Sequence, residues 1–420
     1  MDLTQISPIN NGLKMLANKK YRDLSDNNTF AGGFPHEYFM WLRQENPIFW
    51  HEATDKTPDG EGFWVVSRYK DIVKIATNPE VFSSDRGGIR EGGGTAIKDE
   101  ATAGKVLNQT DAPHHRRLRT LVNTGFTVKA VQKLHHALNT IAENLVNSLE
   151  VGQRIDFVQK ISQEIPTQAI CLVLGVPTED RLQLCDWVNR GIETQSESII
   201  ASEYANKIRK YGQKLVQMKR EMPTDDIFSS ITHAKLDEDG TMLSDYELRS
   251  FFSLLFPAGV ETTTRSISGG MLAFIQNPRQ WNLACAQPGF TKSMVEEIVR
   301  WTTPSCYKRR TASCDVEIGG KIVQGGQKIT FWEMSANRDE RQFDKPFIFD
   351  IFRDPNKHLG FGAGAHFCLG ASLARLELKI IFEKLTSRKI RFTLDGEPEW
   401  VPNNRLVGLK TLPVKVEAAR

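Results

Sequence analysis

A single cysteine surrounded by glycines constrains this sequence more than any other feature. Cys368 lies in the glycine-rich run 358–370, and residues 371–385 follow with the spacing of an amphipathic helix. The glycines let the backbone turn tightly and approach a flat ligand closely. At the start of that helix, free amide groups and the positive end of the helix dipole favour a thiolate over a thiol. The sequence therefore predicts a nucleophile or a metal ligand.

Three roles for Cys368 remain open on the residues alone. A nucleophile requires an adjacent base, but the immediate neighbours are Phe367 and Leu369, and nothing in the spacing directs His366 at the sulfur. An apolar surround suits an axial haem ligand, because the environment of a coordinating sulfur sets the potential of the iron. The third role is a buried, inert cysteine, since free cysteine is among the residues most often buried.

The residues around Cys368 resemble the haem-binding signature of the cytochrome P450 family. The shared pattern is Phe361-x-x-Gly364-x-His366-x-Cys368-x-Gly370, followed by Ala371-Ser372-Leu373-Ala374-Arg375-Leu376-Glu377. His366 stands where many members have arginine. The resemblance implies that Cys368 ligates the iron of haem b and that His366 contacts a haem propionate. It also implies that Phe361, Gly364 and Gly370 belong to the cofactor-binding loop.

The resemblance extends over nearly the whole chain, from residues 63–69 to residues 408–414. It implies a mainly α fold with small β-sheets, in which haem lies between a long core helix and the helix after the cysteine loop. No linker or repeat divides the 420 residues, so we expect one domain, 1–420, with a β-rich part within about 30–100. Apolar residues three and four apart predict helices over 129–149, 159–174, 179–219, 245–276, 278–286 and 291–301.

Residues 251–264 of the predicted helix 245–276 are too apolar for a surface helix, so we expect this stretch to run through the core. Pro257 has no amide hydrogen and predicts a local kink. From the residues alone, Glu261 either transfers protons or only caps the helix or forms an ion pair near the bend.

Residues 258–263, Ala-Gly-Val-Glu-Thr-Thr, resemble the oxygen-site pattern of the family. The resemblance implies that Thr262 hydrogen-bonds dioxygen or an ordered water and that Glu261 relays protons from solvent, a positioned acid/base role. It also implies that Gly259 leaves room for dioxygen.

A basic cluster supplies expected partners for the haem propionates, which need cations or hydrogen-bond donors when buried. Residues 111–119 resemble the Asp-Pro-Pro-x-His-x-x-x-Arg helix start of the family, which implies contacts from His115 and Arg119. Their spacing of four places them on one helix face. The resemblance adds Arg310, and His358 as a further contact. Without the resemblance, the histidines of this cluster suit a solvated helix start equally well.

Glu297 and Arg300 are three residues apart and can pair on one helix face, although such pairs are common. By resemblance they form the Glu-x-x-Arg pair of the family, which joins an arginine of the following meander. Arg353 fits that position, so we expect all three residues to be structural supports of the cysteine loop.

Composition narrows the cellular context. Six cysteines without a CxxC pair predict a reducing, cytoplasmic location. The sequence contains no run of about 18 apolar residues, so we expect no membrane anchor. The net charge of +3 is too small to indicate nucleic acid. No flavin or nicotinamide fingerprint is present, so electrons must come from another protein. By resemblance the donors are ferredoxin and ferredoxin reductase, with docking charges at Arg116, Arg117, Lys379 and Lys384.

The resemblance implies a haem-thiolate monooxygenase that uses O2 and two electrons to hydroxylate a hydrophobic molecule: a sterol side chain, terpenoid or alkyl chain. The alternatives are a peroxide-driven haem oxidase and a non-catalytic haem-thiolate ligand-binding protein, against which Glu261 and Thr262 argue. The long loop 85–111 is of the kind that tends to be functional or mobile. The expected substrate-pocket residues are Ile89, Ile97, Leu254, Ala258, Gly259, Cys306 and Val407.

Overall fold

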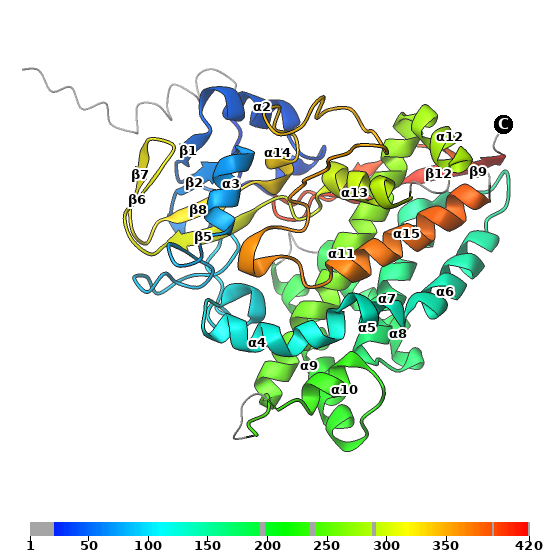
Figure 1. Ribbon diagram of the computed structural model, residues 1–420, viewed down its shortest axis with the longest axis horizontal. Coiled ribbons are helices and arrows are strands. Elements are labelled where there is room, and N and C mark those ends of the chain that lie inside the picture. Colours follow the sequence, from blue (N-terminus) through cyan, green and yellow to red (C-terminus); the bar gives the residue numbers. More distant parts are fainter. Residues whose placement is uncertain (1–20, 194–197, 236–239, 288–290, 389, 419–420) are drawn as a thin grey trace, which may run out of the picture.

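Helices are the main secondary structure of the molecule (Figure 1). The computed structural model describes residues 21–193, 198–235, 240–287, 291–388 and 390–418. The α-helices are α2 (His36–Glu45), α3 (Tyr69–Ala76), α4 (His114–Asn123), α5 (Val128–Gln132), α6 (His135–Asn147), α7 (Glu164–Leu174), α8 (Arg181–Glu193), α9 (Ser198–Glu221), α10 (Ile227–Thr232), α11 (Asp245–Gln276), α12 (Pro278–Ala286), α13 (Thr291–Thr302), α14 (Glu333–Ala336) and α15 (Ala371–Ser387).

Small sheets lie at the edges of the helical part. The strands are β1 (Ile48–His51), β2 (Phe63–Val66), β3 (Phe82–Ser83), β4 (Arg154–Asp156), β5 (Lys308–Ala312), β6 (Val316–Ile318), β7 (Lys321–Val323), β8 (Lys328–Phe331), β9 (Ile390–Leu394), β10 (Glu399–Trp400), β11 (Leu409–Thr411) and β12 (Pro413–Ala418). The largest sheet has the order β1-β2-β8-β5-β3, with only the β2–β8 pair parallel. Strands from residues 48–83 and 308–331, far apart in the chain, therefore share one sheet.

Helix α11 crosses the middle of the molecule, with α15 beside it (Figure 1). A capping box starts α11: the Ser244 side chain accepts from the amide of Glu247, and the Glu247 carboxylate accepts from the amide of Ser244. Most of its residues are buried, as expected for a helix that is apolar on all sides. The helix runs without interruption through Pro257, so the proline does not break it.

The periodicity of the sequence located most helices correctly. The predictions 245–276 and 278–286 coincide with α11 and α12, and 291–301 ends one residue before α13 does. The stretch predicted over 129–149 is divided into α5 and α6, and 179–219 into α8 and α9. Residues 194–197 of that last prediction lie outside the described residues. The fold is the predicted one, mainly α with small sheets.

Candidate functional site

The cysteine loop is closed by its own backbone. The amide of Cys368 donates to the carbonyl of Phe361 at 2.8 Å, and α15 begins three residues after the cysteine. The guanidinium of Arg375 lies 4.4 Å from the ring centroid of Phe361. At Gly364 the backbone has φ of +71°, and a side chain there would clash with the carbonyl of Ala76. Only glycine fits this turn without strain.

The Cys368 side chain is exposed, although protein surrounds its sulfur closely enough for desolvation to raise the pKa of the thiol. The amide of Gly370 hydrogen-bonds the sulfur, and the charges of Lys308, Arg119 and Arg375 also oppose that rise. Cations and an amide donor favour the thiolate, the form that binds metals. The accessible sulfur contradicts the reading of Cys368 as buried, inert core.

His366 lies beside the ring of His115, with 4.1 Å between the ring centroids. Its Nε2 is 2.9 Å from the hydroxyl of Ser84, which engages it away from the Cys368 sulfur. Burial, followed by the charges of Arg310, His115 and Arg119, lowers the pKa of His366 to about 2. His366 is therefore a neutral hydrogen-bonding group.

Two expected propionate partners are buried with unused capacity for a ligand. Nε2 of His115 has no hydrogen-bond partner among the described residues. Arg310 is 4% exposed, and burial lowers its pKa to about 10. Its guanidinium lies over the ring of Phe331 and donates to the neighbouring carbonyl of Arg309. A buried cation of this kind is suited to an anionic ligand.

Arg119 reaches the cysteine loop directly. Its Nη2 donates to the carbonyl of Phe367 at 2.6 Å, and its Nε donates to Asn123 at 3.0 Å. The residue expected as a propionate contact thus also connects α4 to the loop that presents the thiol.

His358 has other partners than the expected propionate. Its Nε2 is 3.0 Å from Oε2 of Glu296, and its Nδ1 accepts from the amide of Gly360. Both ring nitrogens are therefore engaged, and the prediction of a haem contact at His358 was wrong. Glu296 also accepts two hydrogen bonds from Arg375, so His358 helps to fix α15 against α13.

Glu297, Arg300 and Arg353 come together in the interior. Glu297 and Arg300 are both 0% exposed, and they form two hydrogen bonds of 2.7 Å. Arg353 donates to the same carboxylate at 3.2 Å. The amide of Asp350 and the side chain of Asn356 donate to it as well. A buried carboxylate with this many donors holds the chain that leads to the cysteine loop in one geometry.

Glu261 and Thr262 occupy the central turns of α11. The Thr262 hydroxyl is accessible and donates to the carbonyl of Ala258 at 2.9 Å. Burial raises the pKa of Glu261, while the charges of Arg265 and Arg405 oppose the rise. A carboxyl with a raised pKa and an accessible hydroxyl on adjacent residues are chemical groups suited to proton transfer.

Gly259 lies where α11 packs against α7. A Cβ at this position would lie 3.0 Å from two carbons of Ile170 on α7. Its role in leaving room for dioxygen stays a prediction, and the structure shows that the glycine allows α11 and α7 to pack closely. Sequence alone could not decide this, because the neighbour belongs to a distant segment.

Ile89 also lies away from the interior. It is 55% exposed, and its side chain packs near Gly325 and Gly326 at the turn before β8. Gly87 and Gly88, just before it, both have positive φ, a conformation that glycine adopts without strain. The prediction of Ile89 as a pocket residue was therefore wrong.

Ile97, Cys306 and Val407 are packed in one apolar cluster, each 3% exposed or less. The thiol of Cys306 donates to the carbonyl of Asn404 at 2.9 Å. These three buried residues support the wall of the expected substrate pocket and do not form its accessible surface. The loop that carries Ile97 is fixed by Asp99, whose carboxylate accepts from Arg309 at 2.6 Å.

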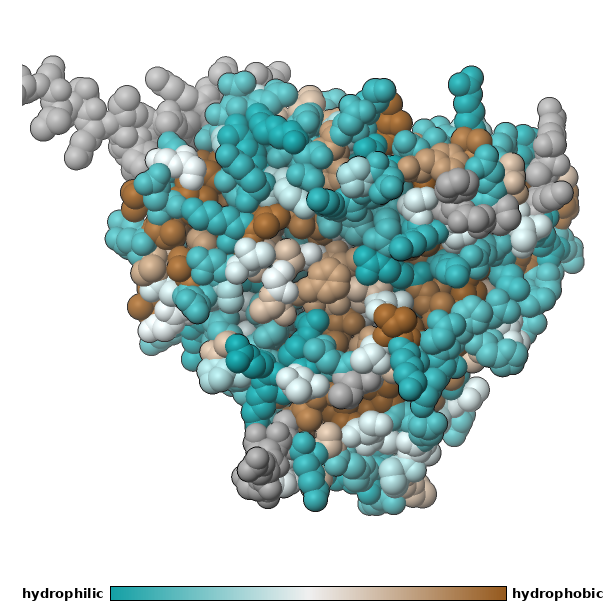
Figure 2. All heavy atoms as spheres, in the orientation of Figure 1, coloured by the Kyte–Doolittle hydropathy of each residue, from teal (hydrophilic) through white to brown (hydrophobic). Residues whose placement is uncertain are grey.

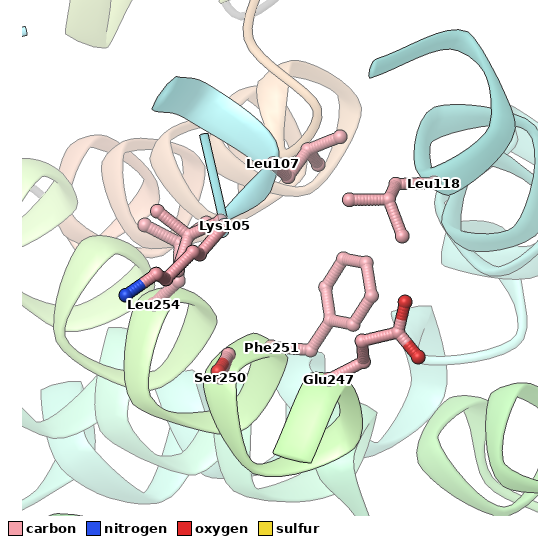
Figure 3. Close-up of a pocket in the computed structure, with 8 residues that line it drawn as sticks. Lys105, Leu107, Leu118, Glu247, Ser250, Phe251 and Leu254 are labelled. Atoms are coloured by element: carbon pink, nitrogen blue, oxygen red, sulfur yellow. The ribbon is translucent and has the colours of Figure 1, made fainter. Parts of the chain in front are cut away.

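Leu254 lines a small cavity between α4, α11 and the loop before α4 (Figure 3). Ala258, one turn further along α11, is exposed. The apolar lining is completed by Val106, Leu107, Leu118 and Phe251. The cavity also has a polar side, formed by Lys105, Glu247 and Ser250.

Haem fits these residues. An accessible thiol under cationic influence can ligate iron, and the buried Arg310 together with the unpartnered His115 nitrogen can receive propionates. Among the described residues, no group of three or more His, Cys, Asp or Glu side chains is arranged to hold a metal ion. Figure 2 shows apolar residues gathered at the middle of the face that carries the cysteine loop. Fold and site together define a haem-thiolate protein.

Comparison with known proteins identifies the family. The cytochrome P450 family model matches residues 286–418. The chain is 43% identical to a Mycobacterium tuberculosis protein named as cytochrome P450 126, over 94% of this chain and 97% of that one. It is 36% identical to the steroid C26-monooxygenase of Rhodococcus jostii, over 94% and 85% of the two chains.

A solved structure agrees with these relatives. A Mycobacterium marinum cytochrome P450 in complex with pseudoionone superposes with a TM-score of 0.82 at 32% identity, covering 90% of this chain and 94% of that one. The chain belongs to the cytochrome P450 family, and it is a monooxygenase that binds haem. No helix within the described ranges combines the length and apolarity needed to cross a membrane.

Three residues of this site were not predicted from the sequence. Ser84 binds His366, Glu296 binds Arg375 and His358, and Arg265 lies one turn after Glu261. The spacing of four between Glu261 and Arg265 was visible in the sequence. Ser84 and Glu296 gave no local signal, because their partners are distant in the chain.

Proposed function

We propose that this monooxygenase uses haem b, O2 and two electrons from a ferredoxin to hydroxylate a sterol side chain, a terpenoid or an alkyl chain. The observation that carries the proposal is the Glu261–Thr262 pair, a carboxyl with a raised pKa next to an accessible hydroxyl. A ligand-binding protein has no use for such a pair.

Cys368 would hold the haem, which would supply the activation of oxygen when bound. The chain itself supplies protons: the Thr262 hydroxyl passes its proton inward and takes one from Glu261, which regains a proton from water. The apolar side chains along α11, such as Leu254, limit water near the reacting centre.

The substrate class follows from the apolar surroundings and the relatives. Leu254 and Ala258 present apolar groups on α11, which favours an apolar ligand. The relative from Rhodococcus jostii is named for a steroid, and the Mycobacterium marinum structure holds pseudoionone. A sterol side chain is therefore our first choice, ahead of a terpenoid or an alkyl chain.

Two measurements test this function. Ligand-induced shifts of the haem spectrum across steroids, terpenes and fatty acids should be largest for steroids, and no shift with any steroid would remove that choice. Turnover with NADH, a surrogate ferredoxin and its reductase under ¹⁸O2 should place labelled oxygen in the product. Turnover that requires added peroxide and does not depend on NADH would instead indicate a peroxide-driven oxidase.

The docking site for ferredoxin is proposed on α4 and on the middle and last turn of α15, where Lys379 and Lys384 lie. Arg116 is exposed on α4, whereas Arg117 lies 3.7 Å from Glu247 and Lys384 lies 3.1 Å from Glu143. Arg116→Glu should lower ferredoxin-supported turnover at low salt, because acidic donors are steered by positive charge. Lys321→Glu, on the distant β6–β7 hairpin (Figure 1), is the matched control. Equal effects of the two variants would exclude this site. The cytoplasmic location and the single domain 1–420 stay predictions.

A further inference from the structure

A buried arginine lies one turn after Glu261 on α11. Arg265 is 4% exposed, and its Nη1 donates to the carbonyl of Leu406. Its Nη2 has no hydrogen-bond partner among the described residues. A buried guanidinium is unfavourable unless an anion balances its charge. The chain must therefore place a negative charge near Arg265.

The carboxyl group that fits is Glu261. The spacing of four places both side chains on one face of α11. Burial raises the pKa of Glu261, and the charge of Arg265 is the largest influence against that rise. In return, burial lowers the pKa of Arg265, and the charge of Glu261 is the largest influence against that decrease.

The other charged groups near the pair are less able to replace Arg265. Arg405, from the segment between β10 and β11, also acts on Glu261. Its guanidinium is already bonded to Glu100 at 3.2 Å and to Thr95 at 2.9 Å. Cys306 is a buried thiol that donates to the carbonyl of Asn404 and is not a cation, so it cannot replace Arg265. Arg265 is thus the principal cation acting on Glu261.

The surrounding backbone is shaped to hold this guanidinium. A Cβ at Gly408 would lie 2.5 Å from Cγ of Arg265, so the close approach of the two segments requires glycine there. The segment around Leu406 is itself fixed, because Leu406 bridges to Ser305 and the amide of Val407 donates to Pro304 at 2.9 Å. Arg265 therefore has little freedom to change its position on this face of α11.

We propose that Arg265 is a positioning residue for the monooxygenase reaction: it pairs electrostatically with Glu261 and makes that acid able to release its proton toward Thr262. The inference rests on the proposed function, in which Glu261 transfers protons. Burial alone would leave Glu261 a neutral acid that holds its proton too tightly. The charge of Arg265 stabilises the carboxylate that remains after transfer, until water returns a proton.

An infrared pH titration of the haem-loaded ferric protein measures the protonation of Glu261 without any turnover. The carboxylic C=O band that disappears in Glu261→Gln is followed against pH in wild type and Arg265→Met. Removing the cation should move the midpoint upward by about one pH unit or more, a tenfold change in the protonation equilibrium. Arg265→Lys should bring the midpoint most of the way back to the wild-type value, because lysine restores the positive charge.

The control variant is Arg249→Met, which removes a cation from the same helix at a position three turns before Glu261 and should leave the midpoint unchanged. Arg265→Gln keeps a donor for the Leu406 carbonyl and gives the same readout if Arg265→Met does not fold. An unchanged midpoint in the folded variant would overturn the inference. Because the titration does not depend on substrate, a failure of the proposed oxygenation leaves this result interpretable on its own.

Discussion

Arg119 of α4 donates a hydrogen bond of 2.6 Å to the carbonyl of Phe367, the residue immediately before Cys368. The helix that supplies His115 is thereby joined to the loop that presents the thiol. The position of the sulfur and the position of the propionate partners consequently depend on each other.

Replacing the thiol should remove the characteristic spectrum of the family. In Cys368→Ser the hydroxyl cannot supply thiolate ligation, so the reduced carbon monoxide complex should lose its thiolate-type absorption. Cys314→Ser, at another exposed cysteine, should keep it. Retention of the thiolate-type spectrum in Cys368→Ser would contradict the assignment of the axial ligand.

Arg310 should control how tightly haem is held. A charge-assisted hydrogen bond to a buried propionate contributes roughly 1.5–3 kcal/mol, so Arg310→Met should release haem about tenfold to a hundredfold faster. Transfer of haem to apomyoglobin measures that rate. Arg116→Gln, on the exposed side of α4, serves as control. Equal release rates in both variants would show that Arg310 does not bind the propionate.

Breaking the buried pair of α13 should destabilise the fold. Arg300→Met leaves the Glu297 carboxylate without its two hydrogen bonds from Arg300, at a site that is 0% exposed, and should cost about 3–5 kcal/mol in the free energy of unfolding. Urea titration followed by circular dichroism gives the value. Arg190→Met, which breaks the exposed pair with Asp186, should change little. Similar small losses of unfolding free energy in both variants would show that the buried network around Glu297 does not stabilise the fold.

The ion pair of Glu296 should make stability depend on pH. Burial opposes ionisation, but the hydrogen bonds from Arg375 and His358 outweigh it and lower the pKa of Glu296 from 4.5 to about 2. The unfolded chain therefore binds this proton more readily than the folded protein does. The stabilisation is present above about pH 4.5 and is lost as the pH falls toward 2.

Unfolding free energies of wild type and Glu296→Gln measure this effect. Their difference should shrink as the pH falls through that interval, whereas Glu150→Gln, at an exposed carboxylate, should differ from wild type by a nearly constant amount. A wild-type to Glu296→Gln difference that does not change with pH would contradict the shift.

Local sequence determined the parts of the site that depend on neighbours in the chain. The glycines before Cys368, the helical spacing of 245–276 and the four-residue spacing of His115 and Arg119 all specify structure through short-range geometry. The family signature added the cofactor, because it joins these local patterns into one known arrangement.

Only the tertiary structure decided which groups face one another. Gly259 meets Ile170 of α7, Ile89 packs on the turn near Gly325, and His358 binds Glu296. The burial of Arg265 beside the segment of Leu406 is likewise a long-range contact. Such contacts join residues far apart in the chain, and periodicity specifies a helix face without specifying what packs against it.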